Sequence, residues 1–359
     1  ELILGVYAGY SILGETVPAN QLQPYIDLAI SQIEFVMGDA ETNEWAALRA
    51  KYGHPEPFKL EYVEIGNEDL YRTAPQSYLA YRWAAFVNAI SAKYPQLKLI
   101  STTNYGAALN PTPKYVDIHH YERPSYFINR YNMYDDRTLY PSTVQIFEGE
   151  YAVIRNNTSS ARLEYPTLEA AVAEATFMAG MEKNSDLVFA AAYAPVLQHV
   201  NGTQWAPDLI GMHYLPDDMR LTNVCIALIP AYDAYNIIKS PSYWVQHMFS
   251  VNRGDTILSV QSTAKINPIY WVASKTKSSA YVKLTNILNT TTTLGFKFPD
   301  LNIASDASAT VLTHSNYYAV NTPANPNVVV PKEVSFTAGK SFTFDVPGQS
   351  VVVLKLALE

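Results

Sequence analysis

The stretch LEYVEIGNEDL, Leu60–Leu70, decides how the first part of this 359-residue chain is interpreted. Apolar residues dominate its first half, which stops at a run of small and polar residues, Gly66, Asn67, Glu68 and Asp69. This pattern is typical of a buried strand in a parallel sheet, where polar side chains gather in the loops after the strands. We therefore predict a strand that ends in a loop carrying Glu68.

The composition is that of a well-buried globular protein. Apolar residues make up 48% of the chain and charged residues only 16%, which argues against disorder. A net charge of -8 and a pI near 5.4 predict no binding to nucleic acid or to an anionic membrane, since both need concentrated Lys and Arg. The 27 tyrosines and five tryptophans offer flat faces with polar tips that suit carbohydrate, although most are expected in the core.

The single cysteine, Cys225, excludes an intrachain disulfide and a cysteine-based metal site. Four sequons, at Asn156, Asn157, Asn201 and Asn289, would accept glycans on a secretory route. No apolar run approaches the about 20 residues of a membrane span, and no signal-like segment opens the chain. We expect a soluble, secreted, extracellular protein whose signal was removed or never present.

The first two thirds of the chain alternate short apolar runs with longer helical patterns, which predicts βαβ units around a parallel sheet. Ser77–Lys93 and Leu168–Asn184 are the clearest predicted helices. Six such strands favour most of a (β/α)8 TIM barrel over an open doubly wound sheet, and the absence of GxGxxG and Walker motifs predicts no nucleotide cofactor. The predicted strands are Leu2–Tyr7, Tyr62–Ile65, Lys98–Thr102, Tyr115–His119, Thr143–Phe147 and Asp186–Tyr193.

From about Ser250 the pattern changes to short alternating stretches broken by Asn, Pro, Gly and Thr, which predicts an antiparallel β-sandwich. We therefore expect two domains, a catalytic (β/α) barrel portion over residues 1–249 and a C-terminal β-sandwich over 250–359. Residues 211–240 fit neither pattern and are interpreted as an insertion or long loop of unknown role.

Chemistry in a barrel gathers at the C-terminal ends of strands. Carboxylates follow two predicted strands, in Asn67–Glu68 and in Glu148–Gly149–Glu150. Two carboxylates with aromatic and amide neighbours match glycosidic bond cleavage, in which one acid protonates the leaving oxygen and the other attacks or activates water. A gap of about 5–5.5 Å between them gives retention of configuration, and about 6.5–9.5 Å gives inversion.

Four motifs carry a family resemblance: YVEIGNED (62–69), DIHHYE (117–122), FEGEYA (147–152) and NGTQWAPDLI (201–210). They resemble the fungal branch of glycoside hydrolase family 51, the α-L-arabinofuranosidases, a retaining family of the large barrel clan. The resemblance spans almost the whole chain outside 211–240. It implies removal of terminal α-L-arabinofuranosyl residues from arabinan, arabinoxylan or arabino-oligosaccharides by double displacement, without a cofactor.

When the family's residue roles are assigned by matching motifs, the resemblance implies that Glu68 is the general acid/base and Glu150 the nucleophile. Asn67 would hydrogen-bond the sugar 2-hydroxyl, a contact that strengthens in the transition state. His120 and Tyr121 match the family's pair after its sixth strand, and Tyr121 would orient the nucleophile. The sugar pocket would also use Trp205 and an amide from Gln198 or Gln204.

The residues alone leave plainer interpretations open. Glu68 could be a surface-loop acid or an acid near a helix N-cap. Glu148 competes with Glu150, because strand alternation puts both on one face, and only the motif GEYA favours Glu150. Glu64 shares a strand face with Glu68 and could be its buried partner.

A zinc site at His119, His120 and Glu122 is the other alternative. Adjacent strand residues point to opposite faces, and no HExxH motif accompanies them. We therefore expect no metal.

When the predicted strands are numbered by comparison with the family's barrel, Leu2–Tyr7 resembles its third strand and Tyr62–Ile65 its fourth. We therefore expect a barrel that lacks its first two strands in this chain, with two unpaired sheet edges. The chain would be the C-terminal piece of a longer or cleaved protein whose other piece stays bound, or a truncated chain. Two further hypotheses stay open: another retaining hydrolase of the clan, such as a β-xylosidase or endoglucanase, and an inactive fragment.

Overall fold

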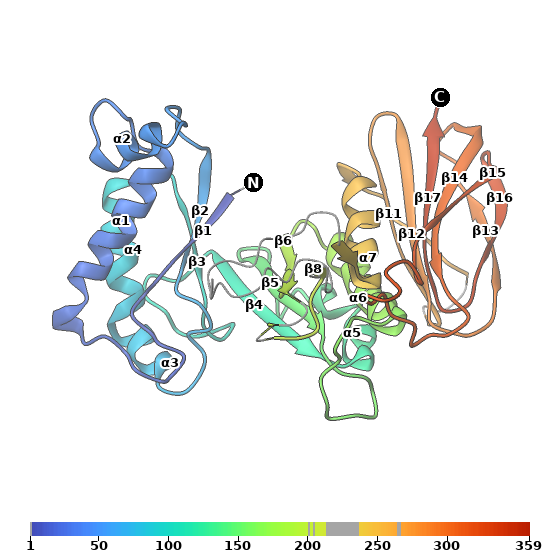
Figure 1. The fold of residues 1–359 in the computed structure, drawn as a ribbon. Helices are drawn as coiled ribbons and strands as arrows, with labels where there is room; N and C mark the ends of the chain where they lie inside the picture. Colours follow the sequence, from blue (N-terminus) through green and yellow to red (C-terminus); the bar gives the residue numbers. More distant parts are fainter. Residues whose placement is uncertain (1, 200–201, 204, 213–236, 264–266) are drawn as a thin grey trace. The chain divides into compact units, whose positions relative to one another are not determined.

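The computed structural model describes residues 2–199, 202–203, 205–212, 237–263 and 267–359. These residues form two compact units (Figure 1). Unit 1 comprises Glu1–His119 and Tyr140–Glu148, and unit 2 comprises His120–Leu139 and Gly149–Glu359. The predicted domain boundary after residue 249 stays a prediction. Cys225, Asn201, Gln204 and most of 211–240 lie outside the described residues.

Six strands in sequential order form the first sheet, as predicted. The pairs β1–β2, β2–β3 and β3–β4 are parallel, and β4 and β5 each begin in unit 1 and end in unit 2. β5 continues beyond its predicted end because its backbone stays extended through Val153, so Glu150 is a strand residue rather than a loop residue. The strands are β1 (Leu2–Val6), β2 (Leu60–Ile65), β3 (Lys98–Ser101), β4 (Tyr115–Glu122), β5 (Gln145–Val153) and β6 (Val188–Tyr193).

Helices cover one face of β1–β3 in unit 1 (Figure 1). Their apolar sides pack on the strands, with Ile33 and Phe86 against Val63 and Ile65 in one buried cluster. The predicted helix Ser77–Lys93 is observed as a short helix, a π-helical turn and a longer helix in succession. The elements are α1 (Gln23–Met37), α2 (Glu44–Lys51), α3 (Ala74–Ser77), the π-helical turn Tyr78–Arg82 and α4 (Trp83–Lys93), with a 3-10 turn at Ala19–Gln21.

Arg49 of α2 closes the C-terminal end of α1. Its side chain is buried, and its guanidinium donates five hydrogen bonds to main-chain carbonyls. The last carbonyls of an α-helix have no partner within the helix, so the guanidinium satisfies groups that burial would otherwise leave unpaired. The acceptors are the carbonyls of Phe35, Val36, Gly38, His54 and Pro55.

The predicted helix Leu168–Asn184 is confirmed as α6 (Leu168–Lys183) in unit 2. Its N-cap Thr167 accepts a hydrogen bond from the Ala170 amide, and the helix is buried over almost its whole length. Gly180 is required there, because a Cβ would lie 2.1 Å from the Tyr131 carbonyl oxygen. Other elements of unit 2 are α5 (Pro124–Asn129), a 3-10 turn (Met133–Asp135), β7 (Leu197–His199), β8 (Ile210–Met212), β9 (Ile237–Lys239) and α7 (Pro241–Val251).

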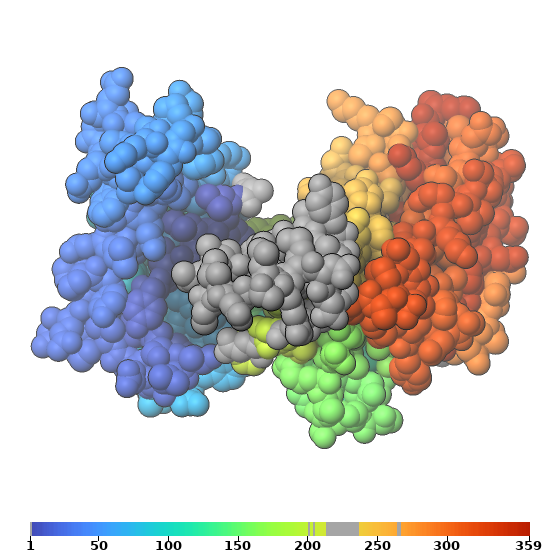
Figure 2. Space-filling view, in the orientation of Figure 1, coloured from blue at the N-terminus to red at the C-terminus, as the bar shows by residue number. Residues whose placement is uncertain are grey.

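Antiparallel strands follow α7, as predicted, and α6 and α7 lie beside them (Figure 1). One sheet has the order β10-β11-β12-β17-β14-β15, and β13 pairs with β16 in a second. Figure 2 shows these strands, in orange and red, at the surface of unit 2. The strands are β10 (Thr256–Ile257), β11 (Ile269–Lys275), β12 (Ser279–Asn286), β13 (Thr292–Lys297), β14 (Ile303–Thr313), β15 (Lys332–Thr337), β16 (Ser341–Val346) and β17 (Ser350–Leu358).

Polar contacts join α6 to the antiparallel sheet. The Lys283 ammonium pairs with Glu182 at 2.5 Å, and the hydroxyls of Thr176 and Thr285 lie 2.8 Å apart. The helix therefore packs on the six-stranded antiparallel sheet through β12. Among the helices of the described residues, none combines the length and apolarity that a membrane crossing requires.

Candidate functional site

Glu68 lies on a turn that begins where β2 ends. Gly66 has φ +94°, and a Cβ there would lie 1.9 Å from an oxygen of the Asp69 carboxylate, so only glycine fits. Glu68 itself has φ +52°, in the left-handed region that costs a non-glycine residue about 1–2 kcal/mol. Strain of this kind at a strand end marks a turn that the surrounding structure holds in place.

A histidine connects Glu68 to a second carboxylate. The Nδ1 atom of His119 lies 3.1 Å from Glu68 Oε1, and its Nε2 atom lies 2.6 Å from Asp117 Oδ2. The side chains of His119 and Asp117 are almost fully buried, while that of Glu68 is one fifth exposed. His119 therefore fixes the orientation of the Glu68 carboxyl. From the sequence alone, His119 is suggested only as a metal ligand.

Ligand atoms of Glu64, Asp117 and His119 lie within 4.8 Å of one another. Carboxylates and imidazole can hold a divalent ion. Both nitrogens of His119 are, however, already directed at carboxylates. The expectation that the protein uses no metal stays a prediction.

Glu150 lies in β5 and receives a hydrogen bond from β4. The Tyr121 hydroxyl donates to Glu150 Oε2 at 2.5 Å, a short bond of the kind that hydroxyls make to carboxylates. Glu150 is half-buried, whereas Glu148, its competitor, is completely buried. Burial therefore favours Glu150 as the carboxylate that a ligand can reach.

His120 points into an aromatic cluster of unit 2. Its ring centroid lies 5.5 Å from that of Tyr126 and 5.8 Å from that of Phe177, which belongs to α6. Strand alternation explains this, because His120 faces away from its neighbours His119 and Tyr121. The substrate-binding role assigned to His120 stays a prediction.

The other predicted binding residues lie in different surroundings. Asn67 is exposed on the turn beside Glu68. Gln198 of β7 is buried, and Trp205 is 52% exposed with the Arg162 guanidinium 5.8 Å from its ring centre. The roles of these three residues in sugar binding also stay predictions.

A buried acid supports the end of β5. Glu174 of α6 is inaccessible to solvent and accepts a hydrogen bond from the Val153 amide at 2.9 Å. Burial raises the pKa of Glu174 to about 8, because the charged form is poorly solvated there. Glu174 is therefore largely protonated at neutral pH.

Comparison with known proteins adds the family context. The family model "Alpha-L-arabinofuranosidase 1 domain" matches residues 1–138, and "Alpha-L-arabinofuranosidase C-terminal domain" matches residues 149–350. The probable alpha-L-arabinofuranosidase A of Aspergillus terreus is 40% identical over 98% of this chain and 52% of its own length. Alpha-L-arabinofuranosidase A of Aspergillus niger is 39% identical over the same shares, and alpha-L-arabinofuranosidase 2 of Arabidopsis thaliana is 28% identical over 96% and 48%. The chain thus spans about half the length of the curated relatives it matches.

Solved structures show the same similarity. An arabinose-bound GH51 α-L-arabinofuranosidase superposes with a TM-score of 0.87 and 40% identity, over 99% of this chain and 54% of that one. The arabinose complex of the Thermotoga maritima enzyme has a TM-score of 0.72 at 18% identity, over 93% and 73%, which supports the fold alone. Together with the observed sheets, these neighbours confirm a TIM-barrel-type sheet followed by a β-sandwich.

Proposed function

Because this chain belongs to the α-L-arabinofuranosidases of glycoside hydrolase family 51, we propose that its protein removes terminal α-L-arabinofuranosyl residues from arabinan, arabinoxylan or arabino-oligosaccharides. The observation that carries the proposal is the 40% identity to an arabinose-bound arabinofuranosidase over 99% of this chain. The geometry supports it, since Glu68 in unit 1 lies beside His119 and Glu150 in unit 2 lies beside Tyr121.

The reaction is a double displacement with retention. Glu150 attacks the anomeric carbon as a carboxylate, and the glycosidic oxygen leaves with the proton of Glu68. Glu68 then takes a proton from water, which attacks the arabinosyl ester and releases Glu150. The Tyr121 hydroxyl holds one Glu150 oxygen and so orients the carboxylate for its attack.

The contacts of His119 suit a protonated Glu68. If the Nε2–H group of neutral His119 donates to Asp117, the Nδ1 lone pair accepts a hydrogen bond from the Glu68 carboxyl group. When the ester forms, Glu150 loses its charge, which favours the deprotonated Glu68 that the second step needs. His119 therefore supports the protonated Glu68 that the first step needs.

The remaining binding roles follow the family motifs. Asn67 binds the sugar 2-hydroxyl beside Glu68, and Trp205 and Gln198 shape the sugar pocket. The motif assigns His120 to the same pocket, although its ring packs on Tyr126 and Phe177.

The barrel is completed from outside this chain. In the described sheet β1 pairs only with β2, and the chain covers about half of its relatives. We infer that β1 corresponds to the third barrel strand and that the first two strands come from the N-terminal part of the same protein, either covalently continuous or bound as a separate piece. Polymeric arabinosides lie outside cells, and the sequons are compatible with secretion, so we place the protein outside the cell.

One comparison of substrates tests the proposed function. Intact mass and N-terminal sequencing first establish whether the N-terminal part is present, and the protein is then assayed on an aryl α-L-arabinofuranoside and an aryl β-D-xyloside. We expect clear preference for the arabinofuranoside. Preference for the xyloside would indicate another retaining hydrolase of the clan, and failure on both with the N-terminal part present would indicate an inactive protein.

A further inference from the structure

We propose that the buried Asp69–Arg82 ion pair is a positioning device for Glu68, which holds the strained turn so that the Glu68 carboxyl faces His119. This inference rests on the acid/base role proposed for Glu68. It concerns two side chains that lie next to the candidate site without reaching a substrate, because both are completely buried.

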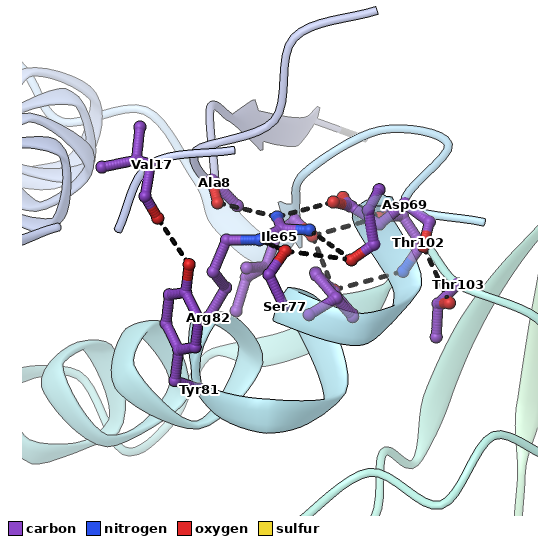
Figure 3. Close-up of polar contacts among 11 residues, drawn as sticks. Ala8, Val17, Ile65, Asp69, Ser77, Tyr81, Arg82, Thr102 and Thr103 are labelled. Atoms are coloured by element: carbon purple, nitrogen blue, oxygen red, sulfur yellow. Dashed lines mark hydrogen bonds and ion pairs between the residues drawn. The ribbon is translucent and has the colours of Figure 1, made fainter. Parts of the chain in front are cut away.

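Asp69 follows Glu68 directly and is held on both its side chain and its main chain (Figure 3). Arg82 Nη1 lies 2.6 Å from Asp69 Oδ1, and the Thr102 hydroxyl donates to Oδ2 at 2.8 Å. The Thr103 hydroxyl donates to the Asp69 carbonyl at 2.9 Å. Burial raises the pKa of Asp69, and Arg82 and Thr102 oppose that rise because both stabilise the carboxylate.

Arg82 connects Asp69 to the rest of unit 1. Its other hydrogen bonds go to the hydroxyl of Ser77 and the carbonyls of Ala8 and Ala74, each at 2.9 Å (Figure 3). These acceptors come from the segment after β1 and from α3, and β3 leads into the threonines that bind Asp69. The carboxylate of Asp69 is thus fixed to two strand ends and a helix at once.

The turn needs the Asp69 contacts because its backbone adopts energetically unfavourable φ angles. Two of its residues have positive φ, and the Asp69 carboxylate folds back over Gly66, where it takes the place that a side chain would fill. The register of β2 with β1 and β3 ends at Ile65, and beyond it the Gly66 amide donates one further main-chain hydrogen bond to the Val6 carbonyl of β1. When the Asp69 contacts are lost, we expect the turn to relax toward ordinary φ values and to carry the Glu68 carboxyl away from His119 Nδ1.

A purely structural role is the competing explanation. A buried ion pair gives little net stability, since desolvation offsets much of the attraction, so its position beside a strained turn points to a geometric role. The two explanations differ in one measurable respect. Loss of folded protein lowers the hydrolysis of all substrates equally, whereas a displaced proton donor penalises only substrates whose leaving group needs the proton.

The test is Asp69→Asn in the full protein, assayed on phenyl and 2,4-dinitrophenyl α-L-arabinofuranosides. We expect kcat/KM for the phenyl glycoside to fall about 30-fold or more, within the range of acid/base effects, and that for the dinitrophenyl glycoside to fall less than about threefold. Arg49→Lys is the matched control. It alters another buried arginine of unit 1, whose hydrogen bonds go to main-chain carbonyls between Phe35 and Pro55 and none to the turn at Glu68. It should therefore lower both rates in parallel.

Parallel loss on both substrates in Asp69→Asn would overturn the positioning role. If that variant does not fold, Thr102→Val removes one hydrogen bond to Asp69 while the ion pair stays, and it should show the same selectivity on a smaller scale. Glu68→Gln separates the two proposals. If Glu68→Gln itself lacks the leaving-group dependence, the acid/base assignment fails and the positioning role fails with it; if it shows the dependence and Asp69→Asn does not, only the positioning role fails.

Discussion

Glu68 and Glu150 stand in contrasting surroundings. Glu68 lies beyond the end of β2, on a strained turn that buried charges fix to unit 1. Glu150 is part of β5, and the end of that strand is held by its own pairing and by α6 behind it. The comparison shows two ways to fix a carboxylate. The turn at Glu68 is held by specific ionic and hydrogen-bonding partners, whereas the strand that carries Glu150 is supported by a packed helix.

The support for Glu150 extends into the sandwich. α6 contacts β5 through Glu174 and the antiparallel sheet through Glu182 and Thr176. The strand that carries Glu150 and the sandwich therefore belong to one core. We infer that the sandwich stabilises the Glu150 half, while the Glu68 half depends on its own buried network.

Removing Glu150, the proposed nucleophile, should have the largest effect on activity. Glu150→Ala leaves no group to attack the anomeric carbon, so we expect kcat for an aryl arabinofuranoside to fall by about 10⁴-fold or more. Steady-state kinetics on folded protein provide the measurement. Near-normal activity of this variant would show that the carboxylate held by β5 is not the nucleophile.

Gly180→Ala tests whether close packing of α6 supports the part of unit 2 that carries Glu150. The added Cβ would meet the Tyr131 carbonyl at 2.1 Å, so we expect unit 2 to lose about 4 kcal/mol of stability in denaturant titration. Gly295→Ala is the matched control, since a Cβ added there on strand β13 would meet no atom within 4 Å, and it should change stability by less than about 1 kcal/mol. Equal effects of the two substitutions would contradict close packing of α6.

Glu174→Gln tests the buried acid behind β5 through its pH dependence. The folded-state pKa is about 8 and the ordinary value is 4.5, so between these pH values the folded protein keeps a proton that the unfolded chain has released. Wild-type stability should therefore fall as pH rises from 4.5 to 8. The glutamine lacks this slope, so its stability relative to wild type should rise by about 3 kcal/mol from pH 5 to pH 8.

Urea denaturation at the two pH values measures that difference. A stability difference that does not change with pH would mean that Glu174 is charged in the folded protein despite its burial.

Tyr121→Phe should have the smallest effect. It removes one hydrogen bond to Glu150 but keeps the ring and the strand, so we expect kcat/KM to fall about tenfold, which corresponds to about 1.4 kcal/mol. An unchanged thermal midpoint would show that the loss is local. If kcat/KM does not change, the hydroxyl has no part in orienting the carboxylate.

The sequence predicted the strands of the first sheet because these depend on local pattern, whereas the roles of both glutamates stay predictions. The strand ending at Ile65 is visible in LEYVEIGNEDL, and α6 follows its helical pattern almost to the residue. The predicted β5 was too short, because Glu148, Gly149 and Glu150 resemble a loop in composition and only pairing with neighbouring strands shows otherwise.

His119 and Asp117 were missed as partners of Glu68, since they lie about 50 residues away and only tertiary structure brings them together. The alternation of side chains along β4 could have identified His119 as a site residue. Once Tyr121 was assigned to Glu150, His119 rather than His120 should share its face of β4. The Asp69–Arg82 pair had no such signal, because an arginine within a helical pattern normally faces solvent.

The most direct test of the central claim is to identify the residue that carries the sugar. If Glu68 is the acid/base, Glu68→Gln should slow release of the arabinosyl-enzyme. The variant is therefore mixed with 2,4-dinitrophenyl α-L-arabinofuranoside, quenched in acid, digested and mapped by mass spectrometry. We predict an arabinosyl ester on Glu150, in the peptide that contains FEGEYA. An ester on Glu148 or on any other residue would contradict the account.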